Sequence, residues 1–97
     1  MVWHVYILRN DRNALYTGVA INPVARYYEH LEGGDKAAKY TRASRSLELV
    51  YTIAADSKSD AYKIEAAIKR LTKDRKEYIV AMQPDLPGLK GILFTKT

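Results

Sequence analysis

Residues 3–20, WHVYILRNDRNALYTGVA, decide the fold. Two runs rich in β-branched and aromatic residues flank the polar cluster at residues 10–13, a pattern that predicts a β-hairpin with a loop of about four residues. Side chains alternate between the two faces of a strand. This alternation puts Tyr16 and Gly18 of the second strand on one face, and we expect Tyr6 of the first strand to lie on that face with them.

A helix should follow the hairpin directly. Asn22-Pro23 is typical of a helix start, with an N-cap residue followed by proline at the first helical position. Gly33-Gly34 is typical of a helix end. Between these limits apolar residues recur at helical spacing, which predicts a core-facing stripe of Val24, Tyr27, Tyr28 and Leu31.

The remaining chain predicts one more strand and further helices. In chain order we expect a short basic helix over residues 35–44, a strand over 47–54, a helix over 58–71, a helix from the N-cap Thr72 through about Met82, and a loop over 84–91 that leads to a short apolar end at 92–94. This order predicts an α+β fold, with a small three-stranded, mainly antiparallel sheet flanked by helices. We expect residues 1–82 to form the domain and residues 83–97 a C-terminal tail that packs on it.

Composition excludes several classes of protein. The chain has 97 residues, 47% hydrophobic and 28% charged, which describes one compact domain. The absence of cysteine excludes a disulfide scaffold, a thiol nucleophile and an iron–sulfur cluster, and two histidines alone argue against structural zinc. No glycine pattern for a nucleotide is present, no run approaches the ~20 apolar residues of a membrane span, and no signal peptide is recognisable. We therefore expect a cytoplasmic protein without an organic cofactor and without a membrane partner.

The net charge of +5 comes from two segments. Residues 36–45 contain four basic and no acidic residues, and residues 58–76 contain seven basic and three acidic residues. Such blocks favour a polyanionic partner, although solvated helix faces have the same composition. Charge alone does not separate these two interpretations.

A set of polar residues in a fixed order points to a family. Residues 5–7 are Val-Tyr-Ile and residues 16–18 are Tyr-Thr-Gly, and they are followed by Arg26, His30, the Lys39-Tyr40-Thr41-Arg42 segment and Glu65. This order resembles the short, single-domain bacterial members of the GIY-YIG nuclease family over roughly residues 3–80. The chain departs from the family pattern at Val5 and Thr17, where the motifs have Gly and Ile. It also has no Asn after Asn22, whereas some members have one late in the domain.

The resemblance implies a metal-dependent endonuclease of DNA, including branched or damaged DNA, with low intrinsic sequence specificity. Glu65 would hold a single Mg²⁺ or Mn²⁺, and Arg26 would bind the scissile phosphate through its planar set of donors. Tyr16 would activate the attacking water, with Tyr6 hydrogen-bonded nearby. His30, as a side chain that ordinarily titrates near pH 6.5, is the competing general base, or else a phosphate-binding or proton-relay group. The sequence does not distinguish Tyr16 from His30 in this role.

Each of these residues also has a purely structural interpretation. The tyrosines could be sheet aromatics under a helix, and Arg26 could be a surface arginine paired with Glu29 or with neighbours of His30. His30 could complement the dipole at the end of its helix. Gly18 could relieve crowding where another group approaches the strand, and this would also open space beside Tyr16. Glu65 could form an i,i+4 ion pair with Lys69, but its position at the edge of an apolar stripe favours a partner such as a metal ion.

Basic residues supply the expected DNA contacts. They recur at every third position in the first block, with an aromatic residue between them, and the candidate contacts are Lys36, Lys39, Tyr40, Arg42, Arg45 and, in the second block, Lys69. A domain of this size has no room for a separate recognition module, so targeting could need a partner protein or self-association. The alternatives are a nucleic-acid-binding module that has lost catalysis and, least favoured, a protein-interaction scaffold.

Overall fold

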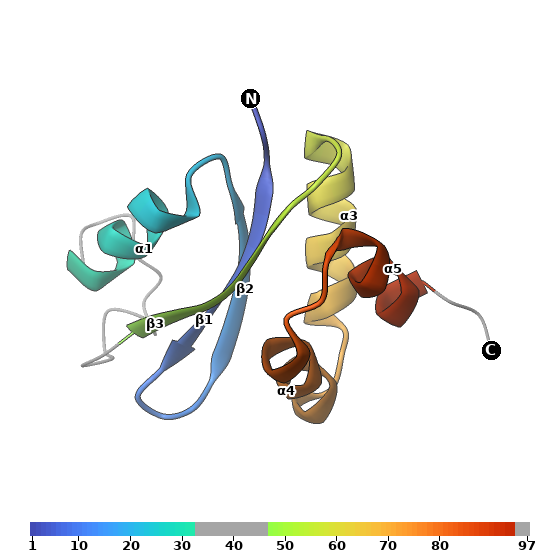
Figure 1. The fold of residues 1–97 in the computed structure, drawn as a ribbon. Helices are drawn as coiled ribbons and strands as arrows, with labels where there is room; N and C mark the ends of the chain where they lie inside the picture. The colour runs from blue at the N-terminus through green and yellow to red at the C-terminus, as the bar shows by residue number, and fades with distance from the viewer. Residues whose placement is uncertain (33–46, 95–97) are drawn as a thin grey trace.

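The computed structural model describes residues 1–32 and 47–94. Its sheet has three strands, β1 (His4–Asn10), β2 (Leu15–Ala20) and β3 (Leu47–Ala54), in the order β2-β1-β3. β1 is antiparallel to both neighbours. Helices pack on this sheet from two sides (Figure 1). The predicted α+β class and the three-stranded antiparallel sheet are confirmed.

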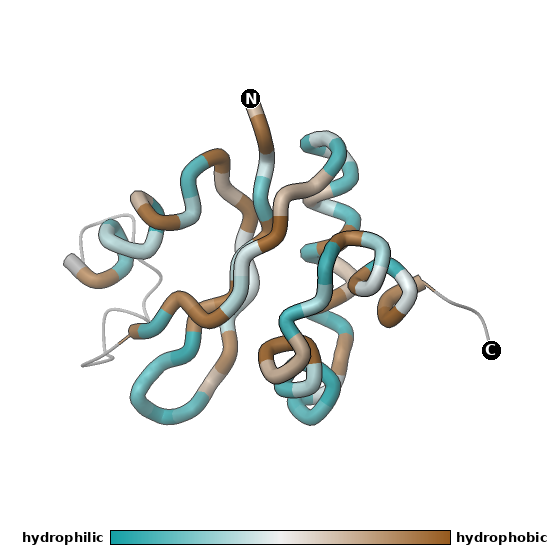
Figure 2. Tube along the Cα trace, viewed as in Figure 1, coloured by the Kyte–Doolittle hydropathy of each residue, from teal (hydrophilic) through white to brown (hydrophobic). Residues whose placement is uncertain are grey.

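The β1–β2 hairpin forms as the sequence predicts. Its loop is closed by two backbone hydrogen bonds, from the Asn10 amide to the Ala14 carbonyl and from the Asn13 amide to the Asn10 carbonyl, both 3.0 Å long. Asn13 has a φ of 64°, a left-handed conformation that asparagine tolerates better than most residues. The loop is hydrophilic between strands that carry hydrophobic residues (Figure 2). The polar cluster therefore sets the turn.

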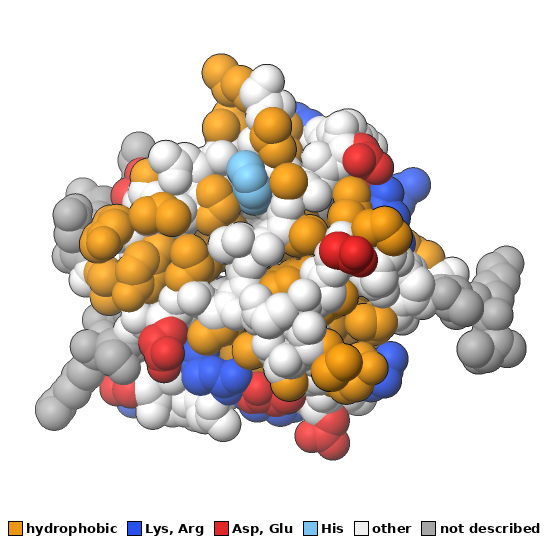
Figure 3. Space-filling view, in the orientation of Figure 1, with side chains coloured by type: hydrophobic (Ala, Val, Ile, Leu, Met, Phe, Trp, Pro, Cys, Tyr) orange, Lys and Arg blue, Asp and Glu red, His pale blue; other side chains and the backbone are white. Residues whose placement is uncertain are grey.

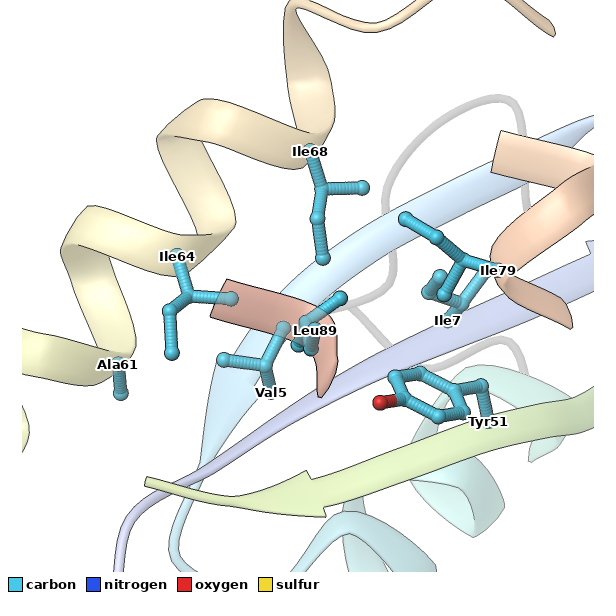
Figure 4. Close-up of a cluster of buried hydrophobic side chains, with 8 residues drawn as sticks. All are labelled: Val5, Ile7, Tyr51, Ala61, Ile64, Ile68, Ile79 and Leu89. Atoms are coloured by element: carbon cyan, nitrogen blue, oxygen red, sulfur yellow. The ribbon is translucent and has the colours of Figure 1, made fainter. Parts of the chain in front are cut away.

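Among the described residues, α3 (Lys58–Lys69), α4 (Lys73–Met82) and α5 (Leu86–Phe94) cover one face of the sheet and α1 (Pro23–Glu32) lies on the other (Figure 1). α3, α4 and α5 enclose the core with β1. The fully enclosed side chains meet between β1, β3 and these three helices (Figure 4); they are Val5, Ile7, Tyr51, Ala61, Ile64, Ile68, Ile79 and Leu89. In the described part of the chain no helix has the length and apolar character needed to cross a membrane.

The helix starts at residues 57 and 72 are confirmed by their caps. The Ser57 hydroxyl accepts a hydrogen bond from the Asp60 amide (3.0 Å), and the Thr72 hydroxyl accepts one from the Arg75 amide (3.3 Å). These bonds satisfy donors that lack partners in the first turn of a helix. α3 ends at Lys69, two residues before the predicted end. The predicted helix over 35–44 and the helix end at Gly33-Gly34 lie outside the described residues.

The core-facing stripe predicted for α1 is wrong in most of its members. Val24, Tyr28 and Leu31 are exposed, and hydrophobic side chains gather over α1 in the surface view (Figure 3). Tyr27 is half-buried, and its hydroxyl donates to the Leu47 carbonyl at 2.8 Å. Helical periodicity identifies an apolar face but does not show how much of that face a neighbouring element covers.

The predicted loop over residues 84–91 is also wrong, because α5 occupies most of it. The Asp85 carboxylate accepts a hydrogen bond from the Gly88 amide (2.9 Å), and the Asp85 carbonyl accepts one from the Leu89 amide (2.8 Å). Pro87 lies in the first turn, where an amide hydrogen is not needed. Leu89 then enters the core. The N-cap and this apolar contact outweigh the two glycines of the segment.

A charged cluster joins the hairpin to α4. Arg9 donates two hydrogen bonds to the Glu77 carboxylate, each 2.7 Å long, and Lys73 pairs with the same carboxylate at 2.7 Å. Lys73 also donates to the Asn13 carbonyl. Hydrogen bonds from Arg9 and then Lys73 lower the pKa of Glu77 from 4.5 to about 2. The folded state thus prefers ionised Glu77 more strongly than the unfolded state does.

This difference predicts a pH-dependent stability. Because the pKa of Glu77 is lower in the folded state, its contribution is complete above about pH 5 and is lost as the pH falls from about 4.5 toward 2. Glu77→Gln should lower the free energy of unfolding at pH 7 by about 1 kcal/mol, and it should flatten the decline of stability over that acid range. Urea unfolding followed by circular dichroism from pH 2 to 8 measures both effects. An unchanged acid decline in the variant would contradict the role of Glu77.

Candidate active site

Tyr6 and Gly18 lie directly opposite each other in the β1–β2 pairing. The Tyr6 side chain is only 6% exposed. A Cβ atom added at Gly18 would lie 2.5 Å from Tyr6 Cζ and 2.9 Å from Cε2, and it would also collide with the hydroxyl. The Tyr6 ring therefore lies across the backbone of β2, in space that any side chain at position 18 would fill. This close approach is the reason for glycine in the second motif.

α1 brings Arg26 to the Tyr6 hydroxyl. The helix begins where the sequence predicts, since the Asn22 carboxamide oxygen accepts a hydrogen bond from the Ala25 amide at 3.1 Å. Arg26 pairs with Glu29 at 2.6 Å, and this hydrogen bond is the main cause that raises the pKa of Arg26, followed by its hydrogen bond to Tyr6. Arg26 thus keeps its charge beside a buried tyrosine while its guanidinium remains partly exposed to solvent.

His30 follows Arg26 by one helical turn and shares its electrostatic environment. Burial is the largest cause that lowers the pKa of His30 below 6.5, and the positive charge of Arg26 lowers it further, whereas Glu29 opposes the change. The imidazole is therefore neutral at pH 7 and able to accept a proton. Tyr6, Arg26 and His30 form one group on the α1 side of the sheet, and we call it the Tyr6–Arg26–His30 group.

Tyr16 lies on the same face of the hairpin and is held by a residue that sequence reasoning missed. Asn10 is buried, and its carboxamide oxygen accepts hydrogen bonds from the Arg12 and Ala14 amides, both 2.9 Å long. Because these two donors fix the oxygen, the amide nitrogen must point the other way, where it donates to the Tyr16 hydroxyl at 3.2 Å. An asparagine that opens a turn cluster was the available signal for this role.

Glu65 comes from α3, on the side of the sheet opposite α1 (Figure 1). Its side chain is 18% exposed and pairs with Lys69 at 3.5 Å, and Lys69 is itself 58% exposed. α1 and α3 both contact β2, one of the two edge strands of the sheet, although α1 contacts β3 more extensively than β2. The structure therefore groups three of the five predicted catalytic residues directly, with Tyr16 on the same face of the hairpin and Glu65 on a helix of the opposite face of the sheet.

The donor set suits a metal ion bound through one carboxylate. The described residues contain no group of three or more His, Cys, Asp or Glu side chains that could enclose an ion. Glu65 is half-buried and its partner is a long, exposed lysine, and such a pair contributes little to stability. Mg²⁺ keeps most of its waters and is commonly bound through one or two carboxylates. Glu65 therefore fits a single hydrated divalent ion.

Most of the predicted DNA contacts cannot be placed. Lys36, Lys39, Tyr40, Arg42 and Arg45 lie outside the described residues. Lys69 is on the exposed face of α3, where it is available to a phosphate once its weak pairing with Glu65 is broken.

Comparison with known proteins gives one consistent family. A model described as "GIY-YIG catalytic domain" matches residues 2–78. A UPF0213 protein of Yersinia enterocolitica is 39% identical over 96 residues, and the match covers 99% of this chain and 95% of that protein. A UPF0213 protein of Cupriavidus necator is 37% identical over 82 residues, and the match covers 84% of this chain and 87% of that protein. The NMR structure of a UPF0213 protein from Bacillus halodurans matches with a TM-score of 0.56 and 33% identity, over 99% of this chain and 100% of that one.

The close approach of Tyr6 and Gly18 predicts a strong coupling between them. Gly18→Ala should lower the free energy of unfolding by about 1–3 kcal/mol, because the buried Tyr6 ring cannot move aside without strain. In a Tyr6→Ala background the same substitution should cost less than about 0.5 kcal/mol. Denaturant unfolding of the four proteins completes the double-mutant cycle. Equal costs of Gly18→Ala in the two backgrounds would contradict the contact.

The environment of His30 predicts how its titration responds to Arg26. Arg26→Gln removes a positive charge beside the imidazole and leaves Glu29 without that partner, and both changes raise the pKa of His30. In the protein without substitutions the pKa of His30 should lie below 6.5, since burial lowers it more than the charge of Arg26 does. NMR titration of the His30 ring measures it. The matched variant Lys63→Gln, on exposed α3 surface, should leave the His30 titration unchanged; a similar shift in both variants would refute the local pairing.

Proposed function

Because this chain belongs to the GIY-YIG catalytic domain family, a nuclease family, we propose that it is a metal-dependent endonuclease that hydrolyses phosphodiester bonds in DNA with little sequence specificity of its own. The observation that carries the proposal is the Tyr6–Arg26–His30 group. It combines a fixed positive charge, a neutral base and a buried phenol on the α1 side of the sheet. These are the groups that phosphodiester hydrolysis needs.

Arg26 is proposed to bind the scissile phosphate. Attack of water on phosphorus increases negative charge on the equatorial oxygens, and a guanidinium offers them several donors in one plane. In the free protein Arg26 pairs with Glu29 three residues away, on the surface of one helix. Such a pair is weak, so a phosphate can replace Glu29 at low cost. The hydrogen bond to Tyr6 keeps the guanidinium oriented while this exchange occurs.

Two residues remain candidates for the general base. His30 is supported by its lowered pKa, which leaves the ring neutral and able to take a proton from water at pH 7. Tyr16 is supported by the family motif and by Asn10, whose amide donates to the phenol oxygen and fixes its position. A general base must lie within hydrogen-bonding distance of the attacking water, and substitution of each residue tests that requirement.

Glu65 is proposed to hold one Mg²⁺ or Mn²⁺ through its carboxylate. When bound, the ion would stabilise negative charge on the leaving 3′ oxygen. α1 and α3 both contact β2, so we expect a phosphodiester bound at this strand to meet Arg26 from the α1 side and Glu65 from the α3 side.

The competing function is a nucleic-acid-binding module without catalysis. Val5 at a motif position that is glycine in the family, and the absence of an Asn after Asn22, favour this alternative. In this alternative the protein still binds DNA but does not hydrolyse the phosphodiester bond. A partner protein or a second copy would supply targeting in either case, because backbone contacts do not read sequence.

Cleavage of plasmid DNA tests the proposal. With Mg²⁺ or Mn²⁺ the protein should nick supercoiled plasmid, and Glu65→Gln should lower the rate roughly 10²–10³-fold, as should Arg26→Gln, because each removes a charge that the transition state needs. The matched control Glu48→Gln removes an exposed carboxylate of β3 and should retain full activity. Gel electrophoresis of the plasmid forms measures the rates.

The outcomes separate the two functions. Metal-dependent nicking that survives Glu65→Gln would refute the metal assignment. Tight, salt-sensitive DNA binding without cleavage, in any divalent metal, would favour the binding module. Loss of activity in Tyr16→Phe but not in His30→Ala would identify the base as Tyr16, and the reverse result would identify His30.

A further inference from the structure

An aromatic pair outside the Tyr6–Arg26–His30 group joins the N-terminal segment to α3. The ring centroids of Trp3 and Tyr62 are 6.2 Å apart, with their planes inclined by 44°. The ammonium group of Lys58 lies over the Trp3 ring, 5.1 Å from its centroid. Trp3 is half-buried and packs against the core, whereas Tyr62 is 47% exposed. The pair therefore presents the Tyr62 ring to solvent on a fixed support.

The same face of α3 carries the candidate metal ligand. Lys58, Tyr62, Glu65 and Lys69 follow one another at intervals of four, three and four residues, which places them in one row along the helix. With a rise of 1.5 Å per residue, Tyr62 and Glu65 are separated by about 4.5 Å along the axis, less than one turn. A ligand held on Tyr62 would thus lie next to the Glu65 carboxylate.

Charge along this row favours a polyanion. Lys58 and Lys69 are exposed at its two ends. The nearest carboxylates on the preceding loop and first turn, Asp56 and Asp60, share one cationic partner, Lys90, at 3.1 and 3.2 Å, which offsets about half of their charge. An exposed aromatic ring between lysines is the arrangement that binds single-stranded nucleic acid, because the ring stacks on a base and the cations contact the backbone.

We propose that Trp3, Lys58 and Tyr62 bind an unpaired base of the nucleic-acid substrate, beside the phosphate that is cleaved at Glu65. The inference rests on the proposed function for the role of Glu65, and it adds the class of substrate. In an intact duplex each base is already stacked on both sides and is not available to Tyr62. DNA with a flap, gap or single-stranded end beside the scissile bond is therefore the preferred substrate.

Trp3 is the one tryptophan of the chain, so its fluorescence reports on this surface. A single-stranded oligonucleotide, titrated into the protein in EDTA so that no cleavage occurs, should quench Trp3 emission in a saturable way. A duplex of the same length should bind with much less quenching. The same titrations give the two dissociation constants, with fluorescence anisotropy of end-labelled DNA as an independent measure of binding.

A matched pair of variants tests the stacking contact. Tyr62→Leu should weaken binding of the single strand about 5-fold or more and change duplex binding less than about 2-fold. Tyr78→Leu is the control, because Tyr78 is a similarly exposed tyrosine on α4, 44% against 47%, with Arg75 over its ring. It should leave both affinities unchanged. Circular dichroism and thermal unfolding should show both variants folded.

Three results would overturn the proposal. One is a single strand that binds without changing Trp3 emission. Another is an equal loss of affinity for single strand and duplex in Tyr62→Leu, or the same loss in Tyr78→Leu. The third is a Trp3 signal that depends on protein concentration without DNA, which would identify the surface as an interface between copies. All these measurements omit metal, so absence of cleavage in the plasmid assay refutes the proposed function without affecting them.

Discussion

β1 is the strand on which both sides of the molecule depend, because it is buried on both faces. Val5 and Ile7 enter the core under α3, α4 and α5. Tyr6 and Leu8 are also buried, and alternation along the strand directs them to the opposite face, where Tyr6 meets Arg26 of α1. β1 is hydrogen-bonded to a strand on each side, so its backbone groups are satisfied. A shift of register by one residue would exchange the two sets of side chains. The core and the candidate active site therefore constrain each other through one strand.

The candidate active site follows from the Tyr6 side of this strand. A buried phenol needs a partner for its hydroxyl, and Arg26 provides one. Gly18 provides the space that the ring occupies against the next strand. The positive charge of Arg26 also disfavours protonation of His30, one helical turn later, and so lowers the pKa of that imidazole. A single aromatic side chain thus links the hairpin motifs to the charges on α1.

The sequence predicted those features that local chemistry determines. The hairpin, the strand over 47–54 and the helix starts at Asn22, Ser57 and Thr72 depend on turn residues, alternation and caps, which can be recognised in one segment. The errors concern contacts between segments. The exposure of the α1 stripe and the helix at α5 depend on what packs against them, and periodicity does not contain that information. Asn10 was missed for the same reason, since its role requires the distance to Tyr16.

The ion pairs of the described residues fall into two kinds, and the difference bears on function. Arg9 and Glu77 are far apart in the sequence and joined by two hydrogen bonds, so this pair links α4 to the hairpin. Arg26 pairs with Glu29, and Glu65 with Lys69, within single helices and at least partly exposed to solvent. Pairs of this second kind contribute less than about 1 kcal/mol each. A phosphate at Arg26 and a cation at Glu65 can therefore replace these partners without weakening the fold.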